Sequence, residues 1–312
     1  MLVIHDLNAE QPEWESSALT LGVFDGMHRG HQALISQVQK RSRTSRGAEP
    51  RARILVTYHP HPDLVLGKRE AGRSELFTYT EKLALYQKFD LDAVVFLPFT
   101  KELARMTALR YLKEILLGKL RAKHIIIGYD QHFGRGRKGD YGFLKQMSRK
   151  YDFRVEQVGA VRYRGRIVST SRIRALLAEG AVNQANRLLG HDFFIDALVV
   201  RGQQRGSTIG FPTANLDVPP TKTIPGGGVY TAVAELGKQR FRAMVNIGIN
   251  PTFGQNQLSV EAHLLEFSGD LYGEHLRVFF LDRIRDEQKF DSIEALKAQL
   301  ERDRRIAQKI KL

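Results

Sequence analysis

Apolar residues in the first half of the chain follow two alternating patterns. Short runs are apolar at nearly every position, and the segment after each run repeats its apolar residues every three or four positions. The first pattern is typical of strands buried on both faces, and the second of helices that pack one face against a core. Strands are predicted at residues 19–24, 53–59, 93–99, 124–130 and 153–161, and helices at 31–41, 80–89, 101–120, 142–151 and 171–180.

The alternation of strands and helices predicts an α/β fold with a doubly wound parallel sheet. Parallel strands need crossover connections, and helical crossovers cover both faces of such a sheet. Pro60 and Pro62 end the second predicted strand, and Thr80 is the candidate N-cap of the helix that follows it.

The pattern changes after about Gly190. The remaining apolar segments are short, and glycine, proline and asparagine separate them. This arrangement is typical of an antiparallel barrel or sandwich. The clear strands are predicted at residues 195–202, 230–236, 240–248, 260–267 and 275–285.

The chain has 312 residues, a length that indicates two domains. The change of pattern predicts one domain at residues 1–184 and a second at 185–312. The second domain closes with a predicted helix that Asp291 or Ser292 can cap. The buried face of this helix is expected to carry Ile293, Leu296 and Leu300.

Composition narrows the class of protein. The chain has no cysteine, which excludes disulfides, thiolate catalysis and cysteine-based zinc sites and fits a reducing cytoplasm. The first residues do not form a signal peptide, and no apolar run reaches the length of a membrane span. We therefore predict a cytoplasmic protein with no membrane partner.

The formal net charge of +14 indicates an anionic partner. Nucleic acid, anionic lipid and small phosphates all qualify. The basic clusters at residues 40–47 and 301–311 carry no interleaved aromatic residues for base stacking, and solvent-exposed segments explain them without a partner. Nucleic-acid binding remains an alternative interpretation, for which the net charge alone is weak support.

The segment GVFDGMHRGH, residues 22–31, lies at a predicted strand-to-helix turn. Such turns lie at the carboxyl ends of parallel strands, where open α/β sheets bind ligands. The helix N-terminus favours an anion, and His28 and His31 share one side of its first turn. This arrangement suits a phosphorus centre that gains negative charge in a transition state. A metal pair and a pair of core histidines remain alternatives, because HxxH alone is a weak metal signal.

Two later segments also follow predicted strands. STSRIR, residues 169–174, places three hydroxyl groups and Arg174 at a helix start, which makes a second candidate anion site. GYDQHFGRGRKGD, residues 128–140, contains a match to GxGxxG at 134–139. These glycines come several residues after the strand, so we interpret them as a mobile basic loop and not as a dinucleotide fingerprint.

The second half contains GFPTANL, residues 210–216, and no P-loop. Thr213 and Asn215 present neutral oxygens to one side if the segment is extended, and Mg²⁺ on a nucleotide accepts such ligands. Glu261 shares its predicted strand face with His263 and Leu265, so it is expected to point inside a barrel as a candidate general base. Alternatively, the PTAN segment is a simple turn and Glu261 an exposed strand residue.

The order and spacing of GVFDGMHRGH, GYDQHFGRGRKGD and STSRIR resemble the three signatures of the flavin-adenylylating nucleotidyltransferases. TYHPHP, residues 57–62, resembles a run that these flavin enzymes carry at the same place. The segments GQQRGSTIGFPTANL, IPGGGVYTA, NIGINPTFG and VEAHLLEFSGDLYG resemble the riboflavin kinase domain, including its PTAN motif. Nearly the whole chain is thus similar to the bacterial bifunctional riboflavin kinase/FAD synthetase family.

The resemblance implies that the first domain transfers AMP from ATP to FMN and releases pyrophosphate. His28 and His31 would then contact the ATP phosphates and stabilise the transition state, and Arg137 would reach the phosphates from the basic loop. Gly22, Phe24 and Asp25 would line the nucleotide site, Gly128 and Asp130 would contact adenosine, and Ser169, Thr170 and Arg174 would hold the triphosphate.

For the second domain, the resemblance implies a six-stranded barrel that phosphorylates riboflavin with ATP and Mg²⁺. Thr213 and Asn215 would hold Mg²⁺ and phosphate, and Glu261 would accept the proton of the substrate hydroxyl. Gly210 would allow close approach of the backbone to nucleotide. The expected partners are riboflavin, FMN and ATP, with no nucleic acid. The sequence allows an oligomer without requiring one.

Overall fold

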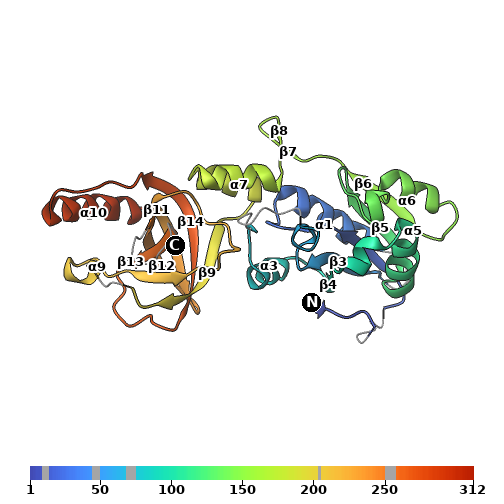
Figure 1. Cartoon of the computed structure of the whole chain (residues 1–312), viewed down its shortest axis with the longest axis horizontal. Helices are drawn as coiled ribbons and strands as arrows, with labels where there is room; N and C mark the ends of the chain where they lie inside the picture. Colours follow the sequence, from blue (N-terminus) through green and yellow to red (C-terminus); the bar gives the residue numbers. More distant parts are fainter. Residues whose placement is uncertain (9–13, 44–49, 68–74, 203–204, 250–257) are drawn as a thin grey trace. The chain divides into compact units, whose positions relative to one another are not determined.

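The computed structural model describes residues 1–8, 14–43, 50–67, 75–202, 205–249 and 258–312 (Figure 1). The chain divides into two compact units. The first comprises Met1–Arg73 and Lys82–Val168, and the second comprises Ser74–Glu81 and Ser169–Leu312. This division describes packing. The functional domains expected at 1–184 and 185–312 stay a prediction.

The first unit is built on six parallel strands in the order β1-β4-β3-β2-β5-β6. The predicted doubly wound sheet is therefore confirmed. The order changes direction between β2 and β5, which makes this pair the switch point of the sheet. The strands are β1 (Leu2–Ile4), β2 (Ser17–Leu21), β3 (Ala52–His59), β4 (Ala93–Pro98), β5 (Ala122–Gly128) and β6 (Arg154–Val158).

Helices connect these strands and pack on the sheet. Helix α1 (Arg29–Ser42) packs on β2, β3 and β5, where Leu34, Ile35 and Val38 are buried. The others are α2 (Pro62–Val65), α3 (Tyr79–Tyr86), α4 (Lys101–Arg105), α5 (Ala108–Arg110), the π-helix η1 (Tyr111–Lys119), the 3₁₀ turn η2 (Arg135–Arg137) and α6 (Tyr141–Met147). A hairpin of β7 (Arg162–Tyr163) and β8 (Arg166–Ile167) completes the unit.

The core of the first unit lies along the central strands. Leu19, Ile54, Val95 and Ile125, from four neighbouring strands, are completely buried. Apolar burial at about 25 cal/mol per Å² makes such a layer the main stabilising contribution to the fold. This rigid sheet positions the loops at its carboxyl edge.

The second unit is built on a closed six-stranded antiparallel barrel in the order β10-β13-β12-β11-β14-β9. The predicted barrel and its terminal helix are confirmed. Its strands are β9 (Phe193–Val200), β10 (Ala214–Asp217), β11 (Gly228–Leu236), β12 (Gln239–Ile249), β13 (Leu258–Leu264) and β14 (His275–Arg285), and its helices are α7 (Thr170–Ala178), α8 (Val182–Leu189), α9 (Arg205–Thr208) and α10 (Ile293–Ala307).

Two helix predictions in the first half are corrected. Thr80 lies inside α3, and Thr78 caps this helix instead: Thr78 Oγ1 accepts from the Glu81 N–H at 3.3 Å, and the Glu81 carboxylate accepts from the Thr78 N–H at 2.7 Å. This is a capping box, which needs the Glu three residues after the cap. The helix predicted at 101–120 is interrupted after Arg105, because Thr107 caps a new helix by accepting from the Arg110 N–H at 3.2 Å.

The terminal helix packs through the later part of its predicted face. Ser292 is its N-cap, but Ile293 is 60% exposed. Leu300 packs against the cluster of Phe211, Met244, Leu265 and Ala307, as predicted for this face. Asp303 is also fully buried and pairs with Arg285 of β14 at 2.8 Å, so an ion pair and apolar contacts together hold this helix.

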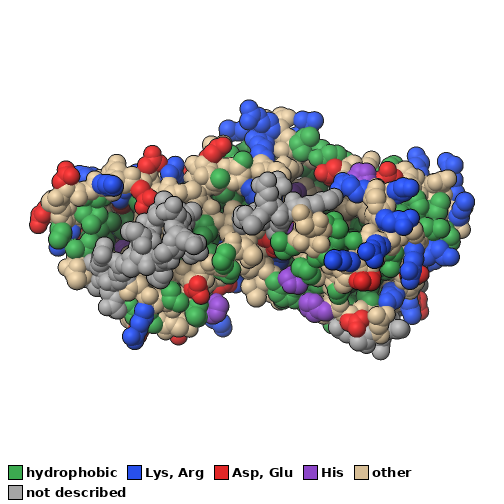
Figure 2. All heavy atoms as spheres, viewed as in Figure 1, with side chains coloured by type: hydrophobic (Ala, Val, Ile, Leu, Met, Phe, Trp, Pro, Cys, Tyr) green, Lys and Arg blue, Asp and Glu red, His purple; other side chains and the backbone are tan. Residues whose placement is uncertain are grey.

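On the face that Figure 2 shows, lysine and arginine side chains are spread over both units with acidic side chains among them. Within the part of the chain that the structure describes, ion pairs link many basic side chains to acidic ones, as between Arg53 and Asp92 at 2.7 Å or Lys123 and Asp152 at 2.5 Å. Among the described residues, no helix is long and apolar enough to cross a membrane.

Candidate active sites

The turn between β2 and α1 brings the two predicted histidines together. His28 is the N-cap of α1, and its Nδ1 accepts a hydrogen bond from the His31 N–H at 3.3 Å. The two rings stack, with centroids 3.6 Å apart and planes at 17°. Because Nδ1 of His28 accepts, the proton of the neutral ring lies on Nε2, which is then a donor. The side-by-side placement expected from the spacing is thus observed.

His31 is held in its neutral form. Burial lowers the pKa of its imidazole well below the ordinary 6.5, and the neighbouring charge of His28 lowers it further. Its Nδ1 is buried and has no hydrogen-bond partner among the described residues. Buried polar atoms usually have a partner, so a ligand at this position would account for the atom. Among the described residues, no group of three or more histidine, aspartate or glutamate side chains could hold a metal ion.

Gly22, Phe24 and Asp25 lie in the same turn. The Phe24 ring packs against His31 with centroids 4.9 Å apart. A Cβ on Gly22 would lie 3.1 Å from the Phe24 ring, which explains the glycine. Asp25 is only 3% exposed, and its Oδ1 lies 3.9 Å from Nζ of Lys82. Of the three residues predicted to line this site, Phe24 therefore packs on the histidine pair, Gly22 packs against Phe24, and Asp25 is buried in the same turn.

The end of β5 lies beside this turn, at the switch point of the sheet. A Cβ on Gly128 would lie 3.5 Å from Asp130 Oδ1 and 4.0 Å from a methyl group of Leu34 in α1. Gln131 Oε1 lies 3.5 Å from the corresponding position on Gly22, so Gln131 also lines the site. Sequence reasoning did not assign Gln131 to the site, although its position directly after Asp130 was a signal.

The basic loop that follows is anchored at its base. Phe133 and Gly139 exchange two backbone hydrogen bonds of 2.8 and 2.9 Å. A Cβ on Gly134 would lie 2.7 Å from Ala108, and one on Gly139 would lie 2.6 Å from the Phe133 ring. These glycines therefore serve local packing, in line with the rejection of a dinucleotide fingerprint. Arg137 is exposed at the tip, and its contact with phosphate stays a prediction.

The second predicted anion site begins α7, in the second unit. Ser169 is its N-cap and accepts from the Arg172 N–H at 3.4 Å. Thr170 is the first helical residue, and Arg174 follows one turn later. Ser169, Thr170 and Arg174 are all partly buried. The helix start is thus confirmed, whereas the triphosphate contact stays a prediction.

The PTAN segment and Glu261 meet on the barrel. Thr213 Oγ1 donates to Glu261 Oε2 at 3.3 Å, and Asn215 of β10 lies directly opposite Glu261 of β13. A Cβ on Gly202 would lie 2.1 Å from the Asn215 amide, so this glycine makes room for that side chain. The alternative of a simple turn is wrong, because Ala214–Asp217 form the sixth strand.

The expectation that Glu261 points inside the barrel is wrong. The inner face of β13 carries Val260 and Ala262, which are 2% and 1% exposed. Glu261 alternates with these residues and therefore lies on the outer face, where it is partly buried. Alternation shows which residues share a face, but it did not show which face meets the core.

A loop covers the outer face of the barrel next to Glu261. The Phe211 N–H donates to Gly206 O at 2.9 Å, and His263 Nδ1 lies 2.7 Å from Pro212 O. Gly210 is exposed with a φ of 84°, a conformation that favours glycine, and a Cβ there would meet nothing within 4 Å. The glycine thus leaves open space beside the PTAN segment. The segment 250–254 that the sequence singled out lies outside the described residues.

These geometries define a two-part transferase: a nucleotidyltransferase-like sheet with a histidine turn and a barrel with a carboxylate held by a hydroxyl group. A family model described as FAD synthetase matches residues 10–172, and one described as riboflavin kinase matches 189–311. The bifunctional riboflavin kinase/FMN adenylyltransferases of Escherichia coli (strain K12) and Bacillus subtilis (strain 168) are 36% and 31% identical to this chain. These alignments cover 96% and 98% of this chain and 94% and 96% of those proteins.

The chain belongs to the bifunctional riboflavin kinase/FMN adenylyltransferase family. Its N-terminal part transfers AMP from ATP to FMN, and its C-terminal part phosphorylates riboflavin with ATP. A crystal structure described as a macrolide-efflux protein from Streptococcus pneumoniae matches with a TM-score of 0.90 and 30% identity, over 100% of both chains. This comparison supports the fold.

Proposed function

We propose that adenylyl transfer takes place at the stacked histidines of the β2–α1 turn. The FMN phosphate attacks the α-phosphorus of ATP, and pyrophosphate leaves. His28 donates from Nε2 to a phosphate oxygen, and His31 contacts the same phosphates beside the N-terminus of α1, whose helix dipole favours an anion. The supporting observation is the 3.6 Å stack of the two rings at the switch point. No protein nucleophile is needed, so catalysis is positioning and electrostatic stabilisation.

The other residues of this site bind the nucleotide. We expect ATP to approach the backbone of the turn and of the end of β5 closely, because Gly22 and Gly128 carry no side chain there. Positive charge and helix N–H groups then hold the phosphates. We assign Gly22, Phe24, Asp25, Gly128 and Asp130 to the nucleoside side, and Arg137, Ser169, Thr170 and Arg174 to the triphosphate.

In the barrel, we propose Glu261 as the general base of riboflavin phosphorylation. Its carboxylate takes the proton of the ribityl hydroxyl while that oxygen attacks the γ-phosphorus of ATP. The Thr213–Glu261 hydrogen bond of 3.3 Å supports this assignment, because it fixes the carboxylate on the outer face of the barrel. A base must lie within hydrogen-bond reach of the proton that it removes, which makes its orientation decisive.

We also propose that Thr213 and Asn215 hold Mg²⁺. Their hydroxyl and amide oxygens, next to a carboxylate, are the hard ligands that this cation accepts. The ion would neutralise charge on the ATP phosphates when bound. We expect chelation with EDTA to stop FMN formation and added Mg²⁺ to restore it. A Thr213→Val/Asn215→Leu protein should need more Mg²⁺ for half-maximal rate, and an unchanged Mg²⁺ requirement would contradict the assignment.

Two variants test the division of the activities between the sites. His28→Ala should lower FAD formation by about 10²–10³-fold, the usual cost of one lost transition-state donor, with FMN formation close to normal. Glu261→Ala should lower FMN formation by about 10²–10⁴-fold and leave adenylyl transfer to added FMN intact. Chromatography of flavins after incubation with ATP and Mg²⁺ measures both steps. A variant that damages both steps equally while still folded would overturn the division.

The cytoplasmic location and the lack of nucleic-acid and membrane partners stay predictions from the sequence. Salt-sensitive retention on duplex or single-stranded nucleic acid at physiological ionic strength would contradict the second of these.

A further inference from the structure

The histidine turn contains two residues in a backbone conformation that side chains disfavour. Phe24 has a φ of 49° and Met27 a φ of 43°, both in the left-handed region, although neither is glycine. Such conformations are sparsely populated by residues other than glycine and persist only where the surrounding structure holds them. Because His28 follows directly, the direction of its ring depends on what holds this turn.

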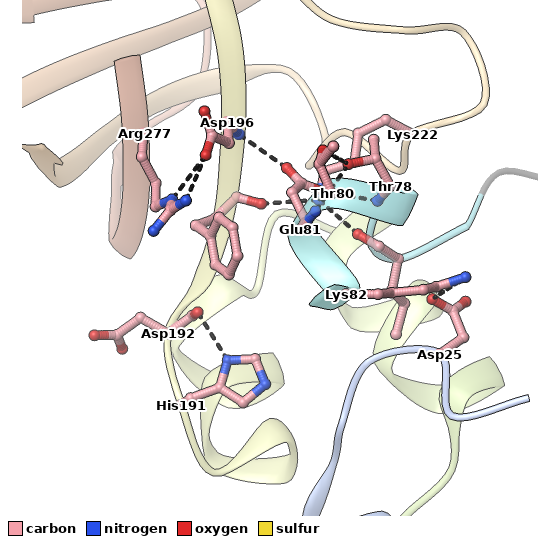
Figure 3. Close-up of polar contacts among 12 residues, drawn as sticks. Asp25, Thr78, Thr80, Glu81, Lys82, His191, Asp192, Asp196, Lys222 and Arg277 are labelled. Carbon is pink, nitrogen blue, oxygen red and sulfur yellow. Dashed lines mark hydrogen bonds and ion pairs between the residues drawn. The ribbon is translucent and has the colours of Figure 1, made fainter. Parts of the chain in front are cut away.

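Side chains of β3 and α3 contact the turn between β2 and α1. Thr57 Oγ1 of β3 donates to Val23 O at 3.0 Å, and Tyr86 OH of α3 donates to Phe24 O at 3.3 Å. Lys82 of α3 also reaches the turn, and its Nζ lies 3.9 Å from Asp25 Oδ1 (Figure 3). Helix α3 therefore contributes two side chains, Tyr86 and Lys82, to the contacts with the consecutive residues Phe24 and Asp25.

Lys82 and Tyr86 reach the turn together because they are four residues apart on α3, which places both side chains on one face of the helix. Tyr86 is fully buried, and Lys82 is 6% exposed. Asp25 is similarly buried, at 3%. Solvent ions screen buried charges much less than exposed ones, so the attraction between Lys82 and Asp25 retains much of its strength.

We propose that Lys82 and Tyr86 are positioning residues for adenylyl transfer. They hold Phe24 and Asp25 so that the backbone of the turn delivers His28 and His31 to the reacting phosphates. Neither residue needs to touch a substrate. The proposal rests on the assignment of the histidine pair to adenylyl transfer, which His28→Ala tests separately.

The test compares Lys82→Met and Tyr86→Phe in the full-length protein. Both changes keep the size of the buried side chain and remove only the polar group. We expect kcat for FAD formation to fall about tenfold, the effect of about 1.4 kcal/mol, with KM for ATP changed much less. Misplaced histidines weaken contacts made in the transition state more than binding of the substrate. Lys82→Arg should recover most of the rate.

The same chain supplies the control for folding. Phosphorylation of riboflavin, measured in the same samples, should keep its wild-type rate in all three variants. Lys88→Met, an exposed lysine six residues further along, should leave both activities unchanged. A parallel fall of both activities, or a loss in Lys82→Met that arginine does not rescue, would show a merely structural role and overturn the proposal.

A double variant tests the contact itself. If Lys82 acts through Asp25, Lys82→Met/Asp25→Asn should be no slower in adenylyl transfer than the slower single variant. Rate losses that multiply would show that Lys82 acts independently of Asp25 and would overturn the proposed route. Retention of FAD formation in His28→Ala would instead refute the site assignment, so the two failures are distinguishable.

Discussion

The burial of the His31 imidazole at the site makes the stability of the folded protein depend on pH. Its imidazole is stacked on His28, and burial lowers its pKa well below 6.5. A neutral ring beside a developing negative charge can accept or donate a hydrogen bond without first losing a proton to solvent. As a consequence, low pH destabilises the folded state, because protonation of His31 is less favourable in the folded than in the unfolded chain.

We expect the free energy of unfolding to decrease as the pH falls below about 6.5. Between the folded and unfolded pKa values of His31, the unfolded chain binds more protons, and stability is lost by at most about 1.4 kcal/mol per pH unit. Well above pH 6.5 the residue is neutral in both states and contributes no pH dependence. Burial also lowers the pKa of His124 and His263, so the decreases add.

Thermal unfolding at several pH values between about 5.5 and 7.5 measures this effect. His31→Gln should flatten the dependence, since the buried titrating group is removed. If wild type and variant lose stability in parallel, His31 is not held in its neutral form by the fold.

At the scale of elements, the first residues of α3, up to Glu81, and the loop before β11 meet within the second unit. Glu81 and Lys222 form an ion pair of 2.8 Å in which both side chains are completely buried (Figure 3). Lys222 Nζ also donates to Leu76 O and Phe194 O at 2.6 and 2.8 Å and lies over the rings of Phe77 and Phe193. The pair thus fastens the segment around Glu81 to the barrel.

Removing one partner of this pair should be costly. Lys222→Met leaves the buried Glu81 carboxylate without the opposite ammonium, and such changes destabilise proteins by about 3–5 kcal/mol. We expect a lower urea midpoint, followed by loss of riboflavin kinase activity. Lys238→Met, an exposed lysine of the same unit, is the matched control. A Lys222→Met/Glu81→Gln protein should recover part of the loss, and a double variant no more stable than Lys222→Met would contradict this account.

At the scale of the whole molecule, one chain carries two consecutive reactions. The product of the barrel, FMN, is the substrate of the nucleotidyltransferase part. The groups assigned to the two chemical steps lie apart in the sequence, with the histidine turn near residue 28 and the base at 261. Damage to one catalytic group therefore leaves the other in place.

We predict that the two single-site variants complement each other. A mixture of His28→Ala and Glu261→Ala proteins, given riboflavin, ATP and Mg²⁺, should form FAD although neither variant does so alone at a comparable rate. FMN made by the first protein diffuses to the intact adenylyltransferase of the second. No FAD from the mixture, with both intact activities verified separately, would show that FMN does not pass through solution.

Much of the fold could be predicted from the spacing of hydrophobic residues along the sequence. Short apolar runs such as residues 125–127 predicted central strands, because burial on both faces of a sheet favours apolar residues at consecutive positions. The three-residue strand β1 and the four-residue strand β10 were missed, because such short segments show no period and exist only through their neighbours. Helix α8 was also missed, although its buried Val182, Ala185 and Leu189 carry a helical spacing.

Only part of the candidate sites could be predicted from the sequence. The spacing of His28 and His31 was sufficient to predict that they share one side of the first turn, because a helical turn places residues three apart side by side. That their rings stack, with centroids 3.6 Å apart, is seen only in the structure. The outward direction of Glu261 was present only as an alternative, and the contribution of Gln131 was not predicted, since both depend on long-range packing.

Local chemistry along the chain was therefore enough to set the class of most long elements, the helix start that carries the histidines and the resemblance to flavin enzymes. Long-range packing alone placed Lys82 and Tyr86 against the histidine turn, Lys222 against Glu81 and Thr213 against Glu261. The physical reason is range: periodicity and capping act within a few residues, whereas these contacts join residues 48 to 141 positions apart, whose meeting only the closed sheet and barrel decide.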